Sequence, residues 1–116
     1  HNPKSHGFNI LDATEVCKTE ATVIAARIKQ AVGTHPAYLT FDIDCLDPAY
    51  APGTGTPCAG GLTTRHALDI LRGLEGINLI GMDVVEVAPA YDVSEITALA
   101  GATIAYQLLA LYASRP

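Results

Sequence analysis

Three aspartates follow one short apolar run, in the stretch TFDIDCLDP, and they are Asp42, Asp44 and Asp47. In an extended strand, residues two apart point to the same side, so Asp42 and Asp44 are expected to lie together. Two carboxylates held that close repel each other, and one takes up a proton unless a cation lies between them. Carboxylate oxygens are hard ligands that favour Mg²⁺, Ca²⁺ or Mn²⁺. The pair therefore predicts a divalent-metal site.

Other acidic residues nearby are assigned different roles. Asp47 precedes Pro48, as a residue that orders a loop through an Asx-turn does, so we predict a structural role for it. Glu86 lies near the end of a second apolar run, INLIGMDVVEV, and is a candidate for the same site. Asp83 lies three residues before Glu86, so an extended strand turns it to the other side and we predict a structural role.

The pattern of apolar residues predicts the elements that position these side chains. Strands are predicted over residues 8–11, 37–43 and 77–87, and helices over 14–32, 64–74 and 94–112. We expect Gly33 to end the first helix, Thr63 or Thr64 to cap the second and Ser94 to cap the third. The βαβαβα order indicates a parallel sheet, and ligands bind at the carboxyl ends of such strands.

Strand 77–87 is apolar on both faces, which is typical of a central strand covered on both sides. A sheet of only three such strands would leave apolar side chains exposed. We therefore expect more strands upstream, or a sheet completed by another chain. His35 in a loop and His66 on a helix are predicted to be surface residues, and His1 and His6 to lie in a terminal loop.

Composition excludes several function classes. The chain has 116 residues, suits one small domain and carries a formal net charge of -5. It has no stripe of Lys and Arg to neutralise phosphates, so we expect no nucleic-acid partner. The apolar run at 77–87 is too short and too charged to span a membrane, so none is expected. Three cysteines without a C-x-x-C pair favour reduced thiols and a cytoplasmic protein.

Two other D-x-D sites were compared with this one. An EF-hand counted from Asp42 would need Gly at position 47 and Glu at position 53, where the chain has Asp47 and Gly53. A phosphatase of the haloacid-dehalogenase type also ends a parallel strand in D-x-D and binds magnesium. It places Thr or Val two residues after the second Asp, where this chain has Leu46. The phosphatase is the less favoured reading.

The stretch TFDIDCLDPAYAPGTGTPCAGG resembles the signature of the ureohydrolases, the arginase and agmatinase family. The fixed positions of that pattern are all satisfied, by Thr40, Phe41, Asp42, Ile43, Asp44, Pro48, Pro52, Gly53 and Gly61. The resemblance extends through GMDVVEVAPAYDVSEITALA and covers nearly the whole chain. It implies a three-layer α/β/α fold with a parallel sheet. Residues 1–116 would be the C-terminal part of a single domain of that fold.

The same resemblance implies site residues and a reaction. Asp42 and Asp44 match two ligands of a binuclear manganese centre, Glu86 matches the carboxylate that holds the substrate guanidinium, and Thr56 matches a residue lining the substrate pocket. The implied reaction is hydrolysis of a guanidinium group, with the two metals supplying hydroxide. Agmatine, giving putrescine and urea, is the favoured substrate, and we expect a homo-oligomer.

The family's other metal ligands lie in two motifs, G-G-D-H and D-A-H-x-D, and neither occurs here. The segment LDATEV has Thr14 where the second motif has His. Three readings therefore stay open. The chain is part of an enzyme acting on agmatine, part of one acting on guanidinobutyrate or another guanidino compound, or a non-catalytic fragment or pseudoenzyme.

Overall fold

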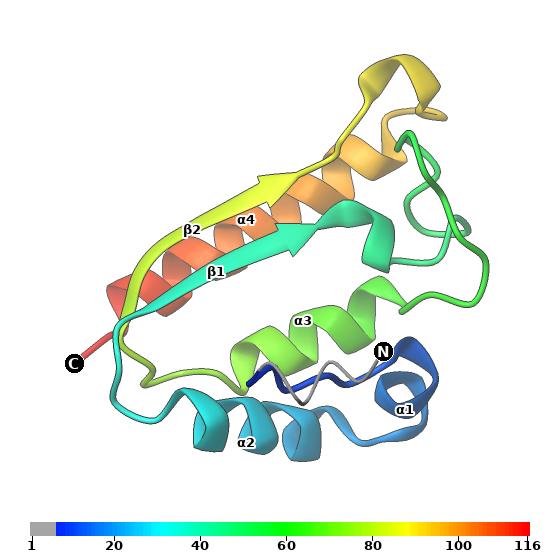
Figure 1. Ribbon diagram of the computed structural model, residues 1–116. Helices are drawn as coiled ribbons and strands as arrows, with labels where there is room; N and C mark the ends of the chain where they lie inside the picture. Colours follow the sequence, from blue (N-terminus) through cyan, green and yellow to red (C-terminus); the bar gives the residue numbers. More distant parts are fainter. Residues whose placement is uncertain (1–6) are drawn as a thin grey trace.

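The computed structural model describes residues 7–116, which form one parallel two-stranded sheet with helices packed on it (Figure 1). The strands are β1 (Ala37–Asp42) and β2 (Leu79–Val85), and they pair in parallel with Asp42 opposite Val85. The helices are α1 (Ala13–Lys18), α2 (Ala21–Val32), α3 (Thr64–Arg72) and α4 (Ile96–Ala113). Because the strands are parallel, their carboxyl ends meet at one edge of the sheet.

The core lies on one side of the sheet, where α3 and α4 pack against each other and α4 packs against β2. Its buried side chains include Phe41 from β1, Leu71 from α3 and Ile104 and Leu108 from α4. The other face carries Tyr38, whose hydroxyl donates a hydrogen bond to Asp83 of β2. No described helix covers that polar network. The predicted α/β class with a parallel sheet is confirmed. The expectation that both faces of strand 77–87 are covered stays a prediction, since Ile80 and Val85 are exposed among the described residues.

Two predicted elements differ from the structure. Residues 8–11 form no strand, so the described sheet has two strands instead of the three expected. The single helix predicted over 14–32 is broken, because Thr19 has an extended backbone and its hydroxyl donates back to the carbonyl of Glu15. The break turns α1 so that its Val16 carbonyl accepts a hydrogen bond from the ring of His66. Tertiary contacts thus override the helical periodicity here.

The helix ends follow local chemistry. Thr63 caps α3 by accepting a hydrogen bond from the His66 N–H, and Gly33, with φ 60°, ends α2 as predicted. The prediction that Ser94 caps α4 is wrong. Asp92 accepts hydrogen bonds from the N–H groups of Thr97 and Ala98 instead, because the left-handed turn at Ser94 and Glu95 brings it beneath the first turn.

Judged by length and composition alone, helix α4 is long and apolar enough to cross a membrane. The expectation of no membrane span considered only the apolar run at 77–87 and overlooked this helix. Part of its apolar surface belongs to the core, through the residues Ala100, Ile104, Leu108 and Leu111. Other apolar side chains of α4 remain exposed, with Leu99 68% and Tyr106 77% accessible. The helix is therefore packed along one side and open along the other.

We predict that the 116-residue chain expressed alone self-associates. In the described residues each strand has one unpaired edge, and Ile80 on β2 is 62% exposed. Unpaired edges and exposed apolar side chains both favour association between copies. Size-exclusion chromatography at about 50 µM should show species larger than a monomer, reduced in an Ile80→Lys variant and unchanged in a Glu75→Lys control. A monodisperse monomer would contradict the prediction.

Candidate active site

Asp42 and Asp44 lie together because of a turn that follows β1. The strand ends at Asp42, and Ile43–Cys45 form one turn of 3₁₀ helix. The Asp42 carboxylate accepts a hydrogen bond from the Asp44 N–H at 3.0 Å, which caps that turn. The sequence reasoning placed both side chains through strand alternation, but the strand does not continue that far. The buried Ile43 between them anchors the turn in the core.

The surroundings of Asp42 shift the pKa of its carboxyl. Burial raises the pKa of Asp42, and the nearby carboxylates of Asp44 and Glu86 raise it further, while the hydrogen bond from the Asp44 N–H opposes them. Burial together with Asp42 and Asp44 also raises the pKa of the Cys45 thiol to about 12, so this cysteine stays neutral at pH 7. Both pKa values therefore reflect burial and the acidic side chains that lie at the carboxyl end of β1.

Thr56 reaches the same place from the loop between β1 and α3. Its hydroxyl donates a hydrogen bond to Asp44 Oδ2 at 2.9 Å, and the residue itself is exposed. The sequence reasoning placed Thr56 in the wall of a substrate pocket, and the structure adds a direct contact with a predicted metal ligand. That contact orients the Asp44 carboxylate.

Glu86 follows β2 immediately and is exposed in an unusual backbone conformation. Its φ is 71°, in the left-handed region that non-glycine residues rarely adopt and that often marks functional sites. Val85 before it pairs with Asp42, so the strand register brings Glu86 to the end of the sheet where Asp42 lies. The residues after it are anchored too, since the Ala88 N–H donates to the Gly53 carbonyl at 2.8 Å.

Asp47 and Asp83, for which structural roles were predicted, make hydrogen bonds that fit those roles. Asp47 accepts hydrogen bonds from the Ala49 and Gly60 N–H groups, both at 2.9 Å, and these bonds lower the pKa of its carboxyl. Asp83 accepts hydrogen bonds from the hydroxyls of Thr40 and Tyr38, which lower its pKa, on the face of the sheet away from the core.

The histidines take no part in the site within the described residues. His66 is half-buried and ties α3 to α1 through the Val16 carbonyl at 2.8 Å, so the prediction of an ordinary surface residue is corrected. His35 is exposed as predicted. His1 and His6 lie outside the described residues.

The donor set fits a divalent metal ion in kind but is incomplete. Carboxylate oxygens suit hard cations, and a cation would relieve the repulsion that raises the Asp42 pKa. Residues 7–116 contain no group of three or more His, Cys, Asp or Glu side chains that could hold a metal ion. Asp42 and Asp44 can therefore supply only part of a metal centre.

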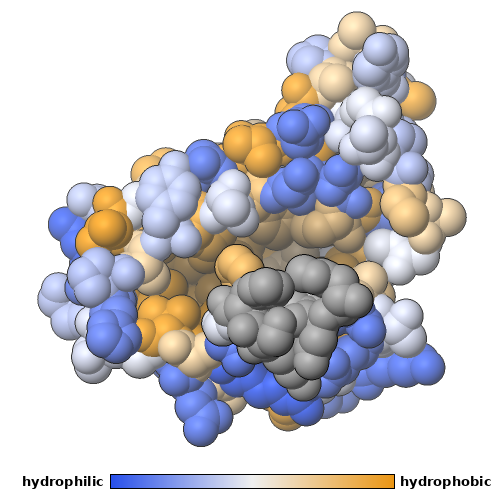
Figure 2. All heavy atoms as spheres, viewed as in Figure 1, coloured by the Kyte–Doolittle hydropathy of each residue, from blue (hydrophilic) through white to orange (hydrophobic). Residues whose placement is uncertain are grey.

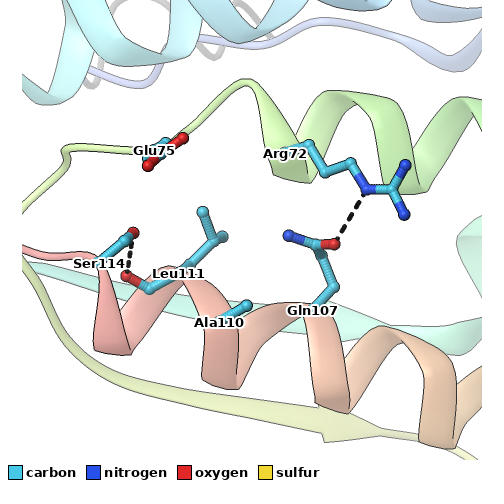
Figure 3. A pocket seen from close by; sticks show the side chains of 6 residues that line it. All are labelled: Arg72, Glu75, Gln107, Ala110, Leu111 and Ser114. Atoms are coloured by element: carbon cyan, nitrogen blue, oxygen red, sulfur yellow. Dashed lines mark hydrogen bonds between the residues drawn. The ribbon is translucent and has the colours of Figure 1, made fainter.

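Cavities occur elsewhere on the molecule. One of about 310 Å³ lies between the C-terminal ends of α3 and α4, where Arg72 donates a hydrogen bond to Gln107 (Figure 3). The C-terminal ends of α3 and α4 lie near the amino ends of the two strands, at the other end of the sheet from the turn that carries Asp44 (Figure 1). An apolar groove of about 250 Å³, lined by Leu39, Phe41 and Leu71 among others, opens between β1 and α3 (Figure 2). The first is lined by Arg72, Glu75, Gln107 and Ser114 and contains none of the predicted site residues, and the second is largely apolar.

Sequence reasoning missed the residues that hold this site together. Gly53 donates its N–H to the Thr97 hydroxyl of α4, and Asp92 anchors the first turn of that helix. Asp92-x-x-Glu95 has the spacing of a capping box in the sequence, but the structure forms none, since Asp92 bonds to the N–H groups of Thr97 and Ala98. The unusual φ of Glu86 left no trace in the sequence.

Comparison with known proteins gives the family. The sequence profile of the Arginase family matches residues 1–111. Curated agmatinases from Photorhabdus laumondii and Escherichia coli O1:K1 are 63% and 59% identical to this chain over 112 residues, which is 97% of it. The chain spans 36% and 37% of their lengths, so it corresponds to about a third of each relative.

Solved structures agree with the sequence match. The chain superposes on a hypothetical agmatinase from Burkholderia thailandensis with a TM-score of 0.91 and 62% identity, covering 97% of this chain and 36% of the other. It superposes on proclavaminate amidino hydrolase from Streptomyces clavuligerus with a TM-score of 0.93 and 40% identity, covering 96% of this chain and 37% of the other. These neighbours confirm the predicted arginase-like fold and argue against the phosphatase reading. The chain belongs to the arginase family.

Proposed function

We propose that this chain forms part of an enzyme that hydrolyses the guanidinium group of agmatine to putrescine and urea. The observation that carries the proposal is the convergence of Asp42, Asp44, Thr56 and Glu86 at one end of the sheet. The agmatinase relatives, up to 63% identical over nearly all of the chain, support agmatine as the substrate.

Each residue has a role that its chemistry allows. Glu86 is exposed at the carboxyl end of β2, and its carboxylate can accept paired hydrogen bonds from a planar, cationic guanidinium. Holding the guanidinium in this way orients its carbon for attack by water. Thr56 contributes a hydroxyl beside Asp44 and fixes the direction of that carboxylate.

Asp42 and Asp44 would supply carboxylate oxygens to a divalent metal centre, which we propose to be manganese. When bound, such a centre would lower the pKa of water, so that hydroxide is available at neutral pH, and would stabilise the tetrahedral centre that forms on attack. The remaining ligands must come from outside residues 7–116, because two carboxylates do not complete the coordination of a metal pair.

A related substrate is the second candidate. The proclavaminate amidino hydrolase superposes on this chain as closely as the agmatinase structure does, although the names of the two proteins differ in substrate. We therefore propose that the matched third of the fold would provide the guanidinium-hydrolysing end of the site whichever guanidino compound is the substrate. Guanidinobutyrate and other guanidino compounds remain alternatives to agmatine, and a non-catalytic chain is the alternative of another class.

Tests of these roles need a chain of the relatives' length. We define the chimera as the Photorhabdus laumondii agmatinase whose matched 112-residue segment is replaced by the corresponding segment of this chain. Urea release from agmatine, guanidinobutyrate and arginine by the chimera decides among the substrates. A chimera that folds and binds metal but releases urea from none of them would refute the proposed function.

Removing either metal-binding carboxylate should deplete the metal. We predict that Asp42→Ala and Asp44→Ala in the chimera each lose at least one manganese ion per chain, because the carboxylate oxygens are the ligands. Asp69→Ala is the matched control, since Asp69 makes only a surface ion pair with Arg65. Elemental analysis after dialysis measures the content. Two manganese ions retained in both variants would overturn the assignment.

Glu86→Gln should weaken catalysis without removing metal. Loss of a charge-assisted hydrogen-bonded pair costs roughly 1.5–3 kcal/mol, or on the order of ten- to a hundredfold in kcat/KM for agmatine. Glu95→Gln is the control, because Glu95 is also exposed with a positive φ but caps nothing with its side chain. Steady-state urea assays with Glu86→Gln that match the unsubstituted chimera would exclude Glu86 from the site.

The 116-residue chain by itself should release no urea. Its described residues hold Asp42 and Asp44 but no larger cluster of metal-binding side chains, so a metal pair cannot be bound tightly. The assay adds manganese and agmatine to the purified chain, with the chimera run in parallel. Turnover by the chain at a rate near that of the chimera would show that the site is complete without further ligands.

A further inference from the structure

The loop that carries Thr56 is fastened at its middle to two other elements. Gly53 lies three residues before Thr56, and both of its backbone polar groups are used. Its N–H donates to the Thr97 hydroxyl of α4 at 2.7 Å, in a buried setting, and its carbonyl accepts from the Ala88 N–H at 2.8 Å. Through its two hydrogen bonds, Gly53 therefore joins the loop beside Asp44 both to α4 and to the turn that follows Glu86.

Thr97 is the centre of this junction. It is fully buried, with 0% of its surface accessible. Its hydroxyl accepts the hydrogen bond from Gly53, and its side chain also helps to lower the pKa of the Asp92 carboxyl. The Gly53 N–H therefore has a hydroxyl partner that no apolar side chain could replace.

Asp92 anchors the first turn of α4, which contains Thr97. Its carboxylate also accepts hydrogen bonds from the N–H groups of Val93, Thr97 and Ala98, at 2.9–3.0 Å. Burial favours the neutral acid, but the hydrogen bonds from Ala98, Thr97 and Val93 outweigh it and lower the pKa of Asp92 to about 2. The anchor is therefore an ionised carboxylate at the N-terminus of α4 at physiological pH.

The approach at the junction is close enough to require glycine. A Cβ on Gly53 would lie 2.9 Å from Asp92 Cβ and from Thr97 Oγ1. The loop therefore rests directly on the two residues that fasten it. On the other side, a Cβ on Gly101 of α4 would lie 3.2 Å from Val87, so the residue after Glu86 packs against the same helix.

We propose that Asp92 and Thr97 are positioning residues that fix the Thr56 loop and the Glu86 turn relative to each other. Through Gly53, they hold the carboxylate that grips the guanidinium at a set distance from the Asp44 carboxylate. This inference rests on the proposed function and adds to it two residues that touch neither metal nor substrate. Displacing reacting groups by about 1 Å can cost on the order of a hundredfold in rate, so such a junction controls turnover.

The test compares Thr97→Val, Thr97→Ser and Thr103→Val in the chimera. Valine keeps the shape of Thr97 but leaves the Gly53 N–H without a partner, whereas serine keeps the hydroxyl. Thr103 lies on the same helix and its exposed hydroxyl bonds only to the Leu99 carbonyl, so Thr103→Val is the matched control. We expect Thr97→Val to lose about ten- to a hundredfold in kcat/KM for agmatine. The loss falls mainly on kcat, since Glu86 itself is retained.

Thr97→Ser should recover to within about threefold of the unsubstituted chimera, and Thr103→Val should match it. Manganese content and a melting curve accompany each variant. Full kinetic activity in Thr97→Val would overturn the proposal. So would a Thr97→Ser variant as impaired as Thr97→Val, because the hydroxyl would then not be the active feature.

A double-mutant cycle separates positioning from general destabilisation. If Thr97 acts through the loop that carries Thr56, the kinetic effects of Thr97→Val and Thr56→Val overlap and the double variant loses less than their product. Independent effects that multiply would contradict the proposal, even if Thr97→Val lowers the melting temperature. If the unsubstituted chimera is inactive on every guanidino compound, the proposed function fails instead, which distinguishes the two failures.

Discussion

The register between β1 and β2 is the constraint on which the site depends. Asp42 lies opposite Val85, so Glu86, the first residue after β2, emerges where the turn after β1 begins. Side chains alternate along a strand, so a slip of one residue would turn Glu86 away. The pairing is supported beneath by Phe41 and Leu79, both buried, and by the packing of α4 against β2.

Beyond the strands, the chain is held by side-chain to backbone hydrogen bonds instead of regular structure. Asp42 caps the turn that presents Asp44, and Asp47 fastens both ends of the following loop through Ala49 and Gly60. Thr97 and Asp92 fasten its middle. Each carboxylate accepts hydrogen bonds from backbone N–H groups of turns, of the loop or of the first turn of α4. A loop so fixed can present Thr56 to Asp44 with little conformational freedom.

Much of this arrangement was predictable from sequence, for identifiable reasons. The strands at Ala37–Asp42 and Leu79–Val85 are runs of apolar and β-branched residues, and Thr63 and Gly33 are clear helix-end signals. The site residues came from the D-x-D pattern and its resemblance to a known signature, and the structure brings them to one edge. The features that the sequence did not predict depend on tertiary contacts. The break at Thr19 depends on contacts between α1 and α3, and the cap on α4 depends on a left-handed turn. The φ of Glu86 depends on anchors at Val85 and Ala88 that no local pattern encodes.

The central claim is that the turn after β1 and the turn after β2 together form one end of a guanidinium-hydrolysing metal site. Anomalous diffraction at the manganese edge, from crystals of the manganese-loaded chimera soaked in guanidinium chloride, tests it most directly. The account predicts anomalous peaks in direct contact with the Asp42 and Asp44 carboxylates, and planar guanidinium density against the Glu86 carboxylate. Manganese bound away from both aspartates, with Glu86 facing solvent alone, would contradict it.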